Sequence, residues 1–217
     1  MQPTTETRSQ YFSLIEELGT DRCGAALSAL REAGANAIEA MQQGLSHENW
    51  RVRRHCAELM DEMANNDCIE PLIGVLNDEN YSVRGAAIHS LICQECKRSP
   101  LKLSDSEKQR VIASSKRELL DKHGRTRAEA LHLLFRMEVD DQQQISEFVP
   151  IALECLSDQS RRLRCAAARC LCKYPDQIPL RPVLRVFLRE THKTTQTILK
   201  RLLGLIIENE DSGRNNS

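Results

Sequence analysis

Apolar residues recur along the chain at fixed distances from a repeated polar motif. The segment 45–53 (LSHENWRVR) returns at 76–84 (LNDENYSVR) and, in more diverged form, at 156–164 (LSDQSRRLR). The arginine that ends each copy marks a column of anchor positions, which are Arg22, Arg53, Arg84, Arg127, Arg164 and Thr195. Units that repeat every ~20–50 residues are typical of solenoids, in which each unit buries its apolar face against its neighbours.

Three apolar columns accompany the anchors and predict two helices per unit. Apolar side chains stand eight residues before each anchor, three after it and seven after it. Offsets of three and seven fall on one helical face, so the anchor is predicted near the start of the second helix. The predicted first helices are 5–18, 36–45, 68–77, 105–120, 143–156 and 179–189. The predicted second helices are 21–33, 49–63, 80–95, 124–137, 160–173 and 192–208.

These elements predict an all-α protein, a right-handed α-solenoid of about six helical pairs in one domain over 1–209. The predicted repeats are 5–33, 36–63, 68–95, 105–137, 143–173 and 179–208. Residues 210–217 are polar and are predicted to form a disordered tail. Aromatic residues make up only 4% of the chain, so the core must be built from aliphatic residues and cysteine.

The pattern Leu-x-Asp-x-x-x-x-Val-Arg-x-x-Ala-x-x-x-Leu resembles the HEAT repeat, in the short form of phycobilisome-lyase-like proteins. The resemblance covers residues 5–208 and departs from the pattern at Thr195, in the last unit. Because the family spans scaffolds, adaptors, lyase subunits, a hydroxylase and DNA glycosylases, it is specific for fold and weak for function. It implies that each anchor arginine pairs with the aspartate of its own turn: Arg84 with Asp78, Arg127 with Asp121, and Arg164 with Asp158.

The nine cysteines are an odd number, and most lie among apolar residues at helical spacing. They are interpreted as reduced thiols of the core, because free cysteine behaves as a small apolar residue. The polar N-terminus predicts no secretory signal, and no apolar stretch approaches the ~18–20 residues that span a bilayer. A soluble, cytoplasmic protein is expected.

Charge is distributed unevenly along the chain, although the formal net charge is only −1. Residues 1–80 hold 6 arginines, no lysine and 14 acidic residues, a net charge of −8. Residues 159–201 hold 11 basic residues and 2 acidic ones, a net charge of +9. Such an asymmetry favours an electrostatic role.

The positive charge is predicted to form a basic stripe along the second helices of the last three units. Positions two before and five after the anchors share a face, away from the apolar one. They hold Arg125, His132, Arg162, Arg169, Lys193 and Lys200. The resemblance implies that second helices line a concave surface, so the stripe is expected to lie there, flanked by Arg161, Lys173 and His192.

The basic stripe suits an anionic partner: an acidic protein segment, nucleic acid or an acidic membrane surface. It carries no aromatic residue, which argues against stacking of single-stranded bases. Two alternatives stay open: a solvated face without a partner, and head-to-tail association of the acidic and basic ends of two copies. Trp50 and Tyr81 share one column and are a second candidate contact, or else pack between repeats.

The search for chemistry in the sequence predicts no catalytic residue, cofactor or metal. Cys93 and Cys96 form a CxxC with His89 one turn before it, but no second CxxC follows at zinc-site spacing. The thiols are therefore interpreted as incidental to a helix end. A single His-Glu pair, His47-Glu48, cannot supply the di-iron site of the HEAT-repeat hydroxylase. A non-enzymatic interaction scaffold is favoured, with a phycobilin-lyase-type enzyme or a nucleic-acid-binding protein as alternatives.

Overall fold

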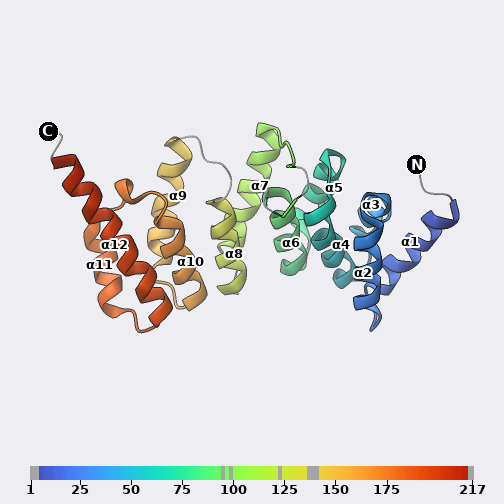
Figure 1. Ribbon diagram of the computed structural model, residues 1–217, viewed down its shortest axis with the longest axis horizontal. Coiled ribbons are helices and arrows are strands. Elements are labelled where there is room, and N and C mark those ends of the chain that lie inside the picture. The colour runs from blue at the N-terminus through green and yellow to red at the C-terminus, as the bar shows by residue number, and fades with distance from the viewer. Residues whose placement is uncertain (1–4, 94–95, 98–99, 122–123, 136–141, 215–217) are drawn as a thin grey trace. The chain divides into compact units, whose positions relative to one another are not determined.

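The computed structural model describes residues 5–93, 96–97, 100–121, 124–135 and 142–214, and this part of the chain contains helices and no strand (Figure 1). The first helices are α1 (Thr5–Glu17), α3 (Ile38–Gly44), α5 (Ile69–Gly74), α7 (Asp105–Glu118), α9 (Gln142–Cys155) and α11 (Leu180–Arg189). The second helices are α2 (Cys23–Ala33), α4 (Trp50–Met63), α6 (Tyr81–Ile92), α8 (Gly124–Leu134), α10 (Arg161–Leu171) and α12 (Lys193–Arg214). The predicted all-α solenoid class is confirmed.

Short 3-10 turns extend several of these helices. They are Gly34–Ala37, Asn66–Cys68, Val75–Asn77 and Pro175–Gln177. The longest difference from prediction is at α12, which continues to Arg214 over residues expected to belong to the polar tail. No helix among the described residues is both long enough and apolar enough to cross a membrane.

The chain forms two compact units, Met1–Ser114 and Ser115–Ser217, with the boundary inside α7. The single domain over 1–209 therefore stays a prediction. In unit 1, α4 packs against α6. Ser90 is fully buried on α6 and donates its hydroxyl to the carbonyl oxygen of Ala57 on α4, at 2.6 Å.

The apolar columns form the core of the inner repeats. Cys56, Met60, Ala87 and Leu91, three and seven residues after their anchors, are fully buried. The second helices α4 and α6 each begin at an asparagine cap, which satisfies a backbone N–H that has no partner within the helix. The Oδ1 atom of Asn49 accepts from the N–H of Arg51 at 3.0 Å, and that of Asn80 accepts from Ser82 at 2.9 Å.

The predicted register of the first repeat is one residue too early. Arg22 is exposed, and the residue three positions after it, Ala25, is exposed as well. The buried positions are Ile15, Ala26 and Leu30, which stand at the expected offsets from Cys23. Arg22 misled the alignment because it is an arginine next to the true anchor. It makes only an exposed ion pair with Glu17, at 3.6 Å.

In unit 2, α10 lies between α8 and α12, while α9 packs on α10 and α11 on α12 (Figure 1). Its core contains the fully buried side chains of Leu131, Leu134 and Leu171, together with the buried ring of Phe148. The ring of Phe135 contacts those of Phe148 and Tyr174, with centroids 6.2 and 5.8 Å apart. These packing contacts orient α10 and α12, and so determine the directions in which their exposed faces point.

The anchor arginines pair forward, with the acidic residue of the next repeat. The guanidinium of Arg53 binds Asp78, with Nε 2.6 Å from Oδ2, and Arg127 binds Asp158, with Nη1 2.5 Å from Oδ2. Arg164 binds Glu190, with Nε 2.7 Å from Oε2. The implied pairing of Arg127 with Asp121 and of Arg164 with the carboxylate of Asp158 is therefore wrong.

The guanidinium of an anchor arginine also binds the turn that precedes its own helix. Nη1 of Arg84 donates to the carbonyl oxygens of Asp78 and Glu79, at 2.8 and 3.1 Å. Arg53 and Arg164 make the equivalent bonds to their own turns. The implied contact between Arg84 and Asp78 thus uses the backbone, since the carboxylate of Asp78 binds Arg53. A planar donor fork can satisfy both sides at once, which explains why arginine stands here.

Candidate functional site

The basic stripe predicted from the sequence lies on the exposed faces of α10 and α12. Arg162 and Arg169 stand seven residues apart on α10, and Lys193 and Lys200 stand seven apart on α12; all four are exposed. Residues seven apart lie on one face, so each helix presents a pair of cations in one direction. His132 is exposed on α8. The side chain of Arg125 lies outside the described residues.

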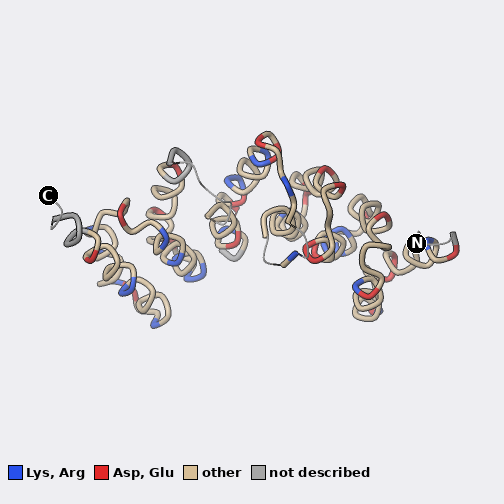
Figure 2. The backbone as a smooth tube through the Cα atoms, turned by 45° about the horizontal axis from the view of Figure 1, so that its top comes forward, with Lys and Arg blue, Asp and Glu red and all other residues tan. Residues whose placement is uncertain are grey.

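These four cations have no acidic partner within the described part of unit 2. No ion pair or side-chain hydrogen bond joins Arg162, Arg169, Lys193 or Lys200 to another described residue. Figure 2 shows Lys and Arg along α10 and α12, and a mixture of both charges in unit 1. Repulsion among unpaired cations makes binding of an anion favourable here.

Cations of unit 1 behave differently, since several of them are paired. Arg31 binds Glu62 at 3.3 Å, Arg54 binds Glu58 at 2.8 Å, and Arg110 binds Glu70 at 2.8 Å. Exposed pairs of this kind contribute little stability, about 0–1 kcal/mol each, but they neutralise the local charge. The excess of unpaired positive charge is therefore a property of the last repeats.

The predicted flanking residues are occupied by contacts inside unit 2. Nη1 of Arg161 donates to Nε2 of His192, 31 residues away, at 2.8 Å. Nζ of Lys173 donates to the carbonyl oxygen of Phe135 at 3.2 Å. Because these donors already have acceptors, the exposed pairs on α10 and α12 are the stronger candidates.

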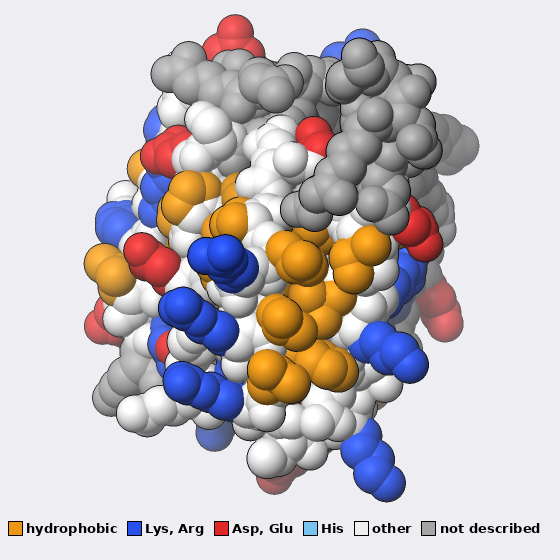
Figure 3. Space-filling model, turned by 90° about the vertical axis from the view of Figure 1, so that its left-hand side faces the viewer, with side chains coloured by type: hydrophobic (Ala, Val, Ile, Leu, Met, Phe, Trp, Pro, Cys, Tyr) orange, Lys and Arg blue, Asp and Glu red, His pale blue; other side chains and the backbone are white. Residues whose placement is uncertain are grey.

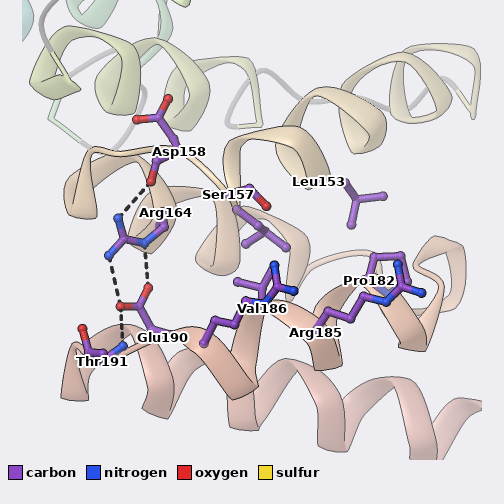
Figure 4. Close-up of a pocket in the computed structure, with 11 residues that line it drawn as sticks. Leu153, Ser157, Asp158, Arg164, Pro182, Arg185, Val186, Glu190 and Thr191 are labelled. Atoms are coloured by element: carbon purple, nitrogen blue, oxygen red, sulfur yellow. Dashed lines mark hydrogen bonds and ion pairs between the residues drawn. The ribbon is translucent and has the colours of Figure 1, made fainter.

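A groove of about 500 Å³ lies between α9 and α11, on the other helix layer of unit 2 (Figure 4). Leu153, Leu156 and Val186 line its apolar part, and Arg185 and Arg189 stand on its α11 side. Arg164 and Glu190 close one end with their ion pair, shown by dashed lines in Figure 4. Sequence reasoning did not predict this groove, because the groove depends on how α9 and α11 are spaced.

Glu190 is the acidic residue at the closed end of this groove. The side-chain hydrogen bonds from Arg164 hold its pKa at about 2, below the ordinary value of 4.5, and the backbone N–H groups of His192 and Thr191 add to this. Burial acts in the opposite direction and is outweighed. Glu190 is therefore ionised near neutral pH. Its negative charge is compensated by Arg164 and by the backbone N–H groups at the start of α12.

An apolar patch lies beside the cations at the C-terminal end of unit 2, where Figure 3 shows apolar side chains with Lys and Arg on both sides. Leu184 and Leu188 on α11 are 41% and 74% exposed, and Ile207 on α12 is 46% exposed. Sequence reasoning missed this patch. The sequence of α11 did contain a signal for it, because the helix has more apolar residues than a single buried face accounts for.

The second predicted contact, Trp50 and Tyr81, is only partly available. Both residues begin a second helix, α4 and α6. Trp50 is half-buried, with the guanidinium of Arg51 over its ring, 5.5 Å from the centroid. Tyr81 is 39% exposed. Their equivalents in the last two repeats, Arg161 and His192, contact each other, which favours packing between repeats as the role of this column.

Two family models that describe HEAT repeats match the chain, over residues 38–95 and 148–174. No curated protein sequence matches it. An archaeal HEAT-like repeats protein from Thermococcus onnurineus NA1 is similar in structure, with a TM-score of 0.56 and 12% identity over 96% of this chain and 82% of that one. A designed armadillo repeat protein gives a TM-score of 0.54 and 13% identity over 95% of both chains.

The phycocyanin lyase complex of a Nostoc species is more distant, with a TM-score of 0.40 and 15% identity over 95% of this chain and 96% of that one. A likeness at that level carries no argument about function, and identities of 12–13% among the others show the fold alone. The repeated motif, the paired helices and the two family matches agree with one another. The chain therefore carries HEAT repeats at residues 38–95 and 148–174, within a helical-repeat fold.

Proposed function

We propose that this protein is a non-enzymatic scaffold that binds an acidic segment of another protein along the basic stripe of α10 and α12. The HEAT- and armadillo-like fold is generally used for protein interaction. The observation that carries the proposal is the set of exposed cations without acidic partners among the described residues of unit 2. The predicted position of the stripe on a concave surface is part of this proposal.

The apolar patch beside the stripe favours a protein over nucleic acid. Leu184, Leu188 and Ile207 offer aliphatic surface, which an amphipathic acidic segment can cover with its own apolar side chains. A phosphate backbone has no comparable apolar face. Binding of single-stranded nucleic acid also uses aromatic side chains for stacking, and the stripe has none.

The test reverses three cations of the stripe in one variant, Arg162→Glu, Arg169→Glu and Lys200→Glu. Capture of partner proteins from a lysate is compared with the wild type at low and high salt, and identified partners are then titrated as purified proteins. Loss of an acidic partner in the variant, and its loss at high salt, is the expected result, because exposed charges are screened by salt. Circular dichroism checks that the variant stays helical.

A matched variant controls for the change in net charge. Arg22→Glu, Lys102→Glu and Lys108→Glu reverse three exposed cations of unit 1 and alter the formal charge by the same amount. This variant is expected to retain the partner. Equal binding by all three proteins would contradict the stripe proposal.

Other occupants of the stripe give distinct results in the same experiments. Nucleic acid in the eluate that disappears in the stripe variant would support the HEAT-like nucleic-acid-binding alternative. Head-to-tail association of copies would show as a sedimentation coefficient that rises with concentration at low salt only. The phycobilin-lyase alternative requires a coloured adduct on co-expression with a bilin and a phycobiliprotein subunit.

A further inference from the structure

Four side chains that can bind a metal meet at the end of α6 in unit 1. His89 lies in the last turn of α6, Cys93 follows the helix directly, and Cys96 lies three residues further on. Asp61 comes from the neighbouring helix α4. One ligand atom of each residue lies within 4.8 Å of the ligand atoms of the other three. The sequence showed the two thiols and the imidazole, but Asp61 joins them only because α4 packs against α6.

The separations within this cluster lie within about 1 Å of the edges of a tetrahedral site. Nε2 of His89 lies 3.2 Å from Oδ2 of Asp61 and 3.9 Å from Sγ of Cys96. Sγ of Cys93 lies 3.0 Å from Sγ of Cys96. Zinc bonds of ~2.0 Å to nitrogen or oxygen and ~2.3 Å to sulfur place tetrahedral ligand atoms about 3.3–3.8 Å apart. Small adjustments of side chains would therefore complete the geometry.

Lys97 affects the charge balance of the cluster. Its side chain is 0% exposed, and its Nζ lies 3.2 Å from Oδ1 of Asp61 and 2.7 Å from the carbonyl oxygen of Cys93. A zinc ion with two thiolates, one carboxylate and a neutral imidazole carries a net charge of about −1. The buried ammonium balances that charge. Because Lys97 contacts Oδ1 of Asp61, the other carboxylate oxygen, Oδ2, remains available to bind the metal.

We propose that Asp61, His89, Cys93 and Cys96 form a structural site for a thiophilic divalent cation, zinc in the first place. Four protein ligands of types N, O, S and S leave no position for a substrate, which is typical of structural rather than catalytic zinc. The ion would join the C-terminal end of α6 to α4 and to the segment around Cys96. The expectation of incidental thiols, drawn from the sequence, is replaced by this proposal.

The test uses the full chain, purified under reducing conditions and stripped of metal by a chelator. Zinc is added, and bound metal is counted by competition with a colour-forming chelator. One equivalent per chain is expected. Cobalt(II) in place of zinc should give the intense visible bands of tetrahedral coordination and the near-ultraviolet bands of thiolate ligands. Zinc should also raise the melting temperature, because it binds the folded chain in preference.

Variants separate this site from the other cysteines of the chain. Asp61→Asn keeps the shape of the side chain and is expected to bind zinc at least about tenfold more weakly, since even outer-shell partners of metal sites contribute ~10–100-fold. Cys96→Ser removes an exposed thiol and should weaken zinc binding and reduce the thiolate bands, since only Cys93 would remain as a sulfur ligand, without unfolding the chain. Cys172→Ser and Asp67→Asn are the matched controls and should bind like the wild type.

Three results would overturn the proposal. The first is no zinc bound by the reduced wild type, and the second is equal binding by Asp61→Asn, Cys96→Ser and the controls. The third is a Cys93–Cys96 disulfide in protein purified without reductant, seen as a mass two hydrogens lower, together with no zinc binding after reduction. That combination would assign the pair to redox chemistry.

Discussion

At the scale of single residues, Glu190 shows how one side chain connects two repeats of unit 2. Its carboxylate accepts from the guanidinium of Arg164 and from the backbone N–H groups of Thr191 and His192, at 3.0 and 2.9 Å. Asp78 and Asp158 take the same place in their own repeats, where each accepts from the backbone N–H two residues further on, at 2.8 and 2.7 Å.

Replacing Glu190 by glutamine should destabilise unit 2 at neutral pH by about 3 kcal/mol, because Arg164 loses a partly buried ionic partner. The pKa of Glu190 is about 2 in the folded chain, against an ordinary value of 4.5. A depressed pKa gives stability that is present above pH 4.5 and lost as the pH falls toward 2. Urea unfolding followed by circular dichroism over this range measures the effect.

Fluorescence would not serve for that measurement, because the single tryptophan, Trp50, lies in unit 1. Glu154→Gln, at an exposed position of α9, is the control and should leave the pH dependence unchanged. The same decline with acid in Glu190→Gln and the wild type would show that another carboxylate is responsible.

The sequence identified the anchor arginines but assigned two of them to the wrong carboxylate. Asp158 stands only six residues before Arg164, so proximity along the chain favoured it. The partner, Glu190, lies 26 residues away and is brought close by the stacking of α10 against α12. A pairing that depends on tertiary contact is not encoded in the spacing of one repeat.

At the scale of elements, α11 has one face in the core and another that nothing described covers. Val183 is fully buried, whereas Leu188 is 74% exposed. The helix thus combines an ordinary packing role with the apolar patch at the end of unit 2. Most helix boundaries were predicted to within a few residues because apolar columns and turn residues agree, the end of α12 being the main exception. The patch was missed because periodicity shows that a face is apolar but not whether a neighbouring helix covers it.

Truncation of these two side chains should affect the free energy of unfolding to different extents. Val183→Ala removes buried methyl groups and should lower the free energy of unfolding by about 1–3 kcal/mol. Leu188→Ala should change it by no more than about 0.5 kcal/mol, since the side chain is exposed. Chemical denaturation of both variants tests this, and a large loss for Leu188→Ala would mean that the outer face of α11 is covered in solution.

At the scale of the whole molecule, charge is sorted by position along the chain. The sequence alone showed the net charge of −8 over residues 1–80 and of +9 over 159–201. The structure adds that Arg162, Arg169, Lys193 and Lys200 are exposed and lack acidic partners among the described residues. The sequence could not show the convergence of Asp61 with Cys93 and Cys96, which requires knowledge of which residues of α4 face α6.

Binding of an acidic polypeptide should therefore leave a localised footprint. Hydrogen–deuterium exchange of the full chain with poly-glutamate is expected to show added protection within residues 159–201 and none within 1–80. Poly-lysine serves as the control and should not protect α10 or α12. Protection spread evenly over both regions would contradict the assignment of the stripe.

The forward pairing of the anchor arginines sets a rule for how repeats can be exchanged. Arg53 with Asp78, Arg127 with Asp158 and Arg164 with Glu190 each join two successive repeats. A graft cut between two repeats would separate the arginine on one side of the cut from its carboxylate on the other. A cut between the two helices of a repeat, after the acid and before the arginine of the second helix, would instead keep each arginine with the acid that it binds. Recombination, natural or engineered, should therefore succeed most often at junctions shifted by half a repeat.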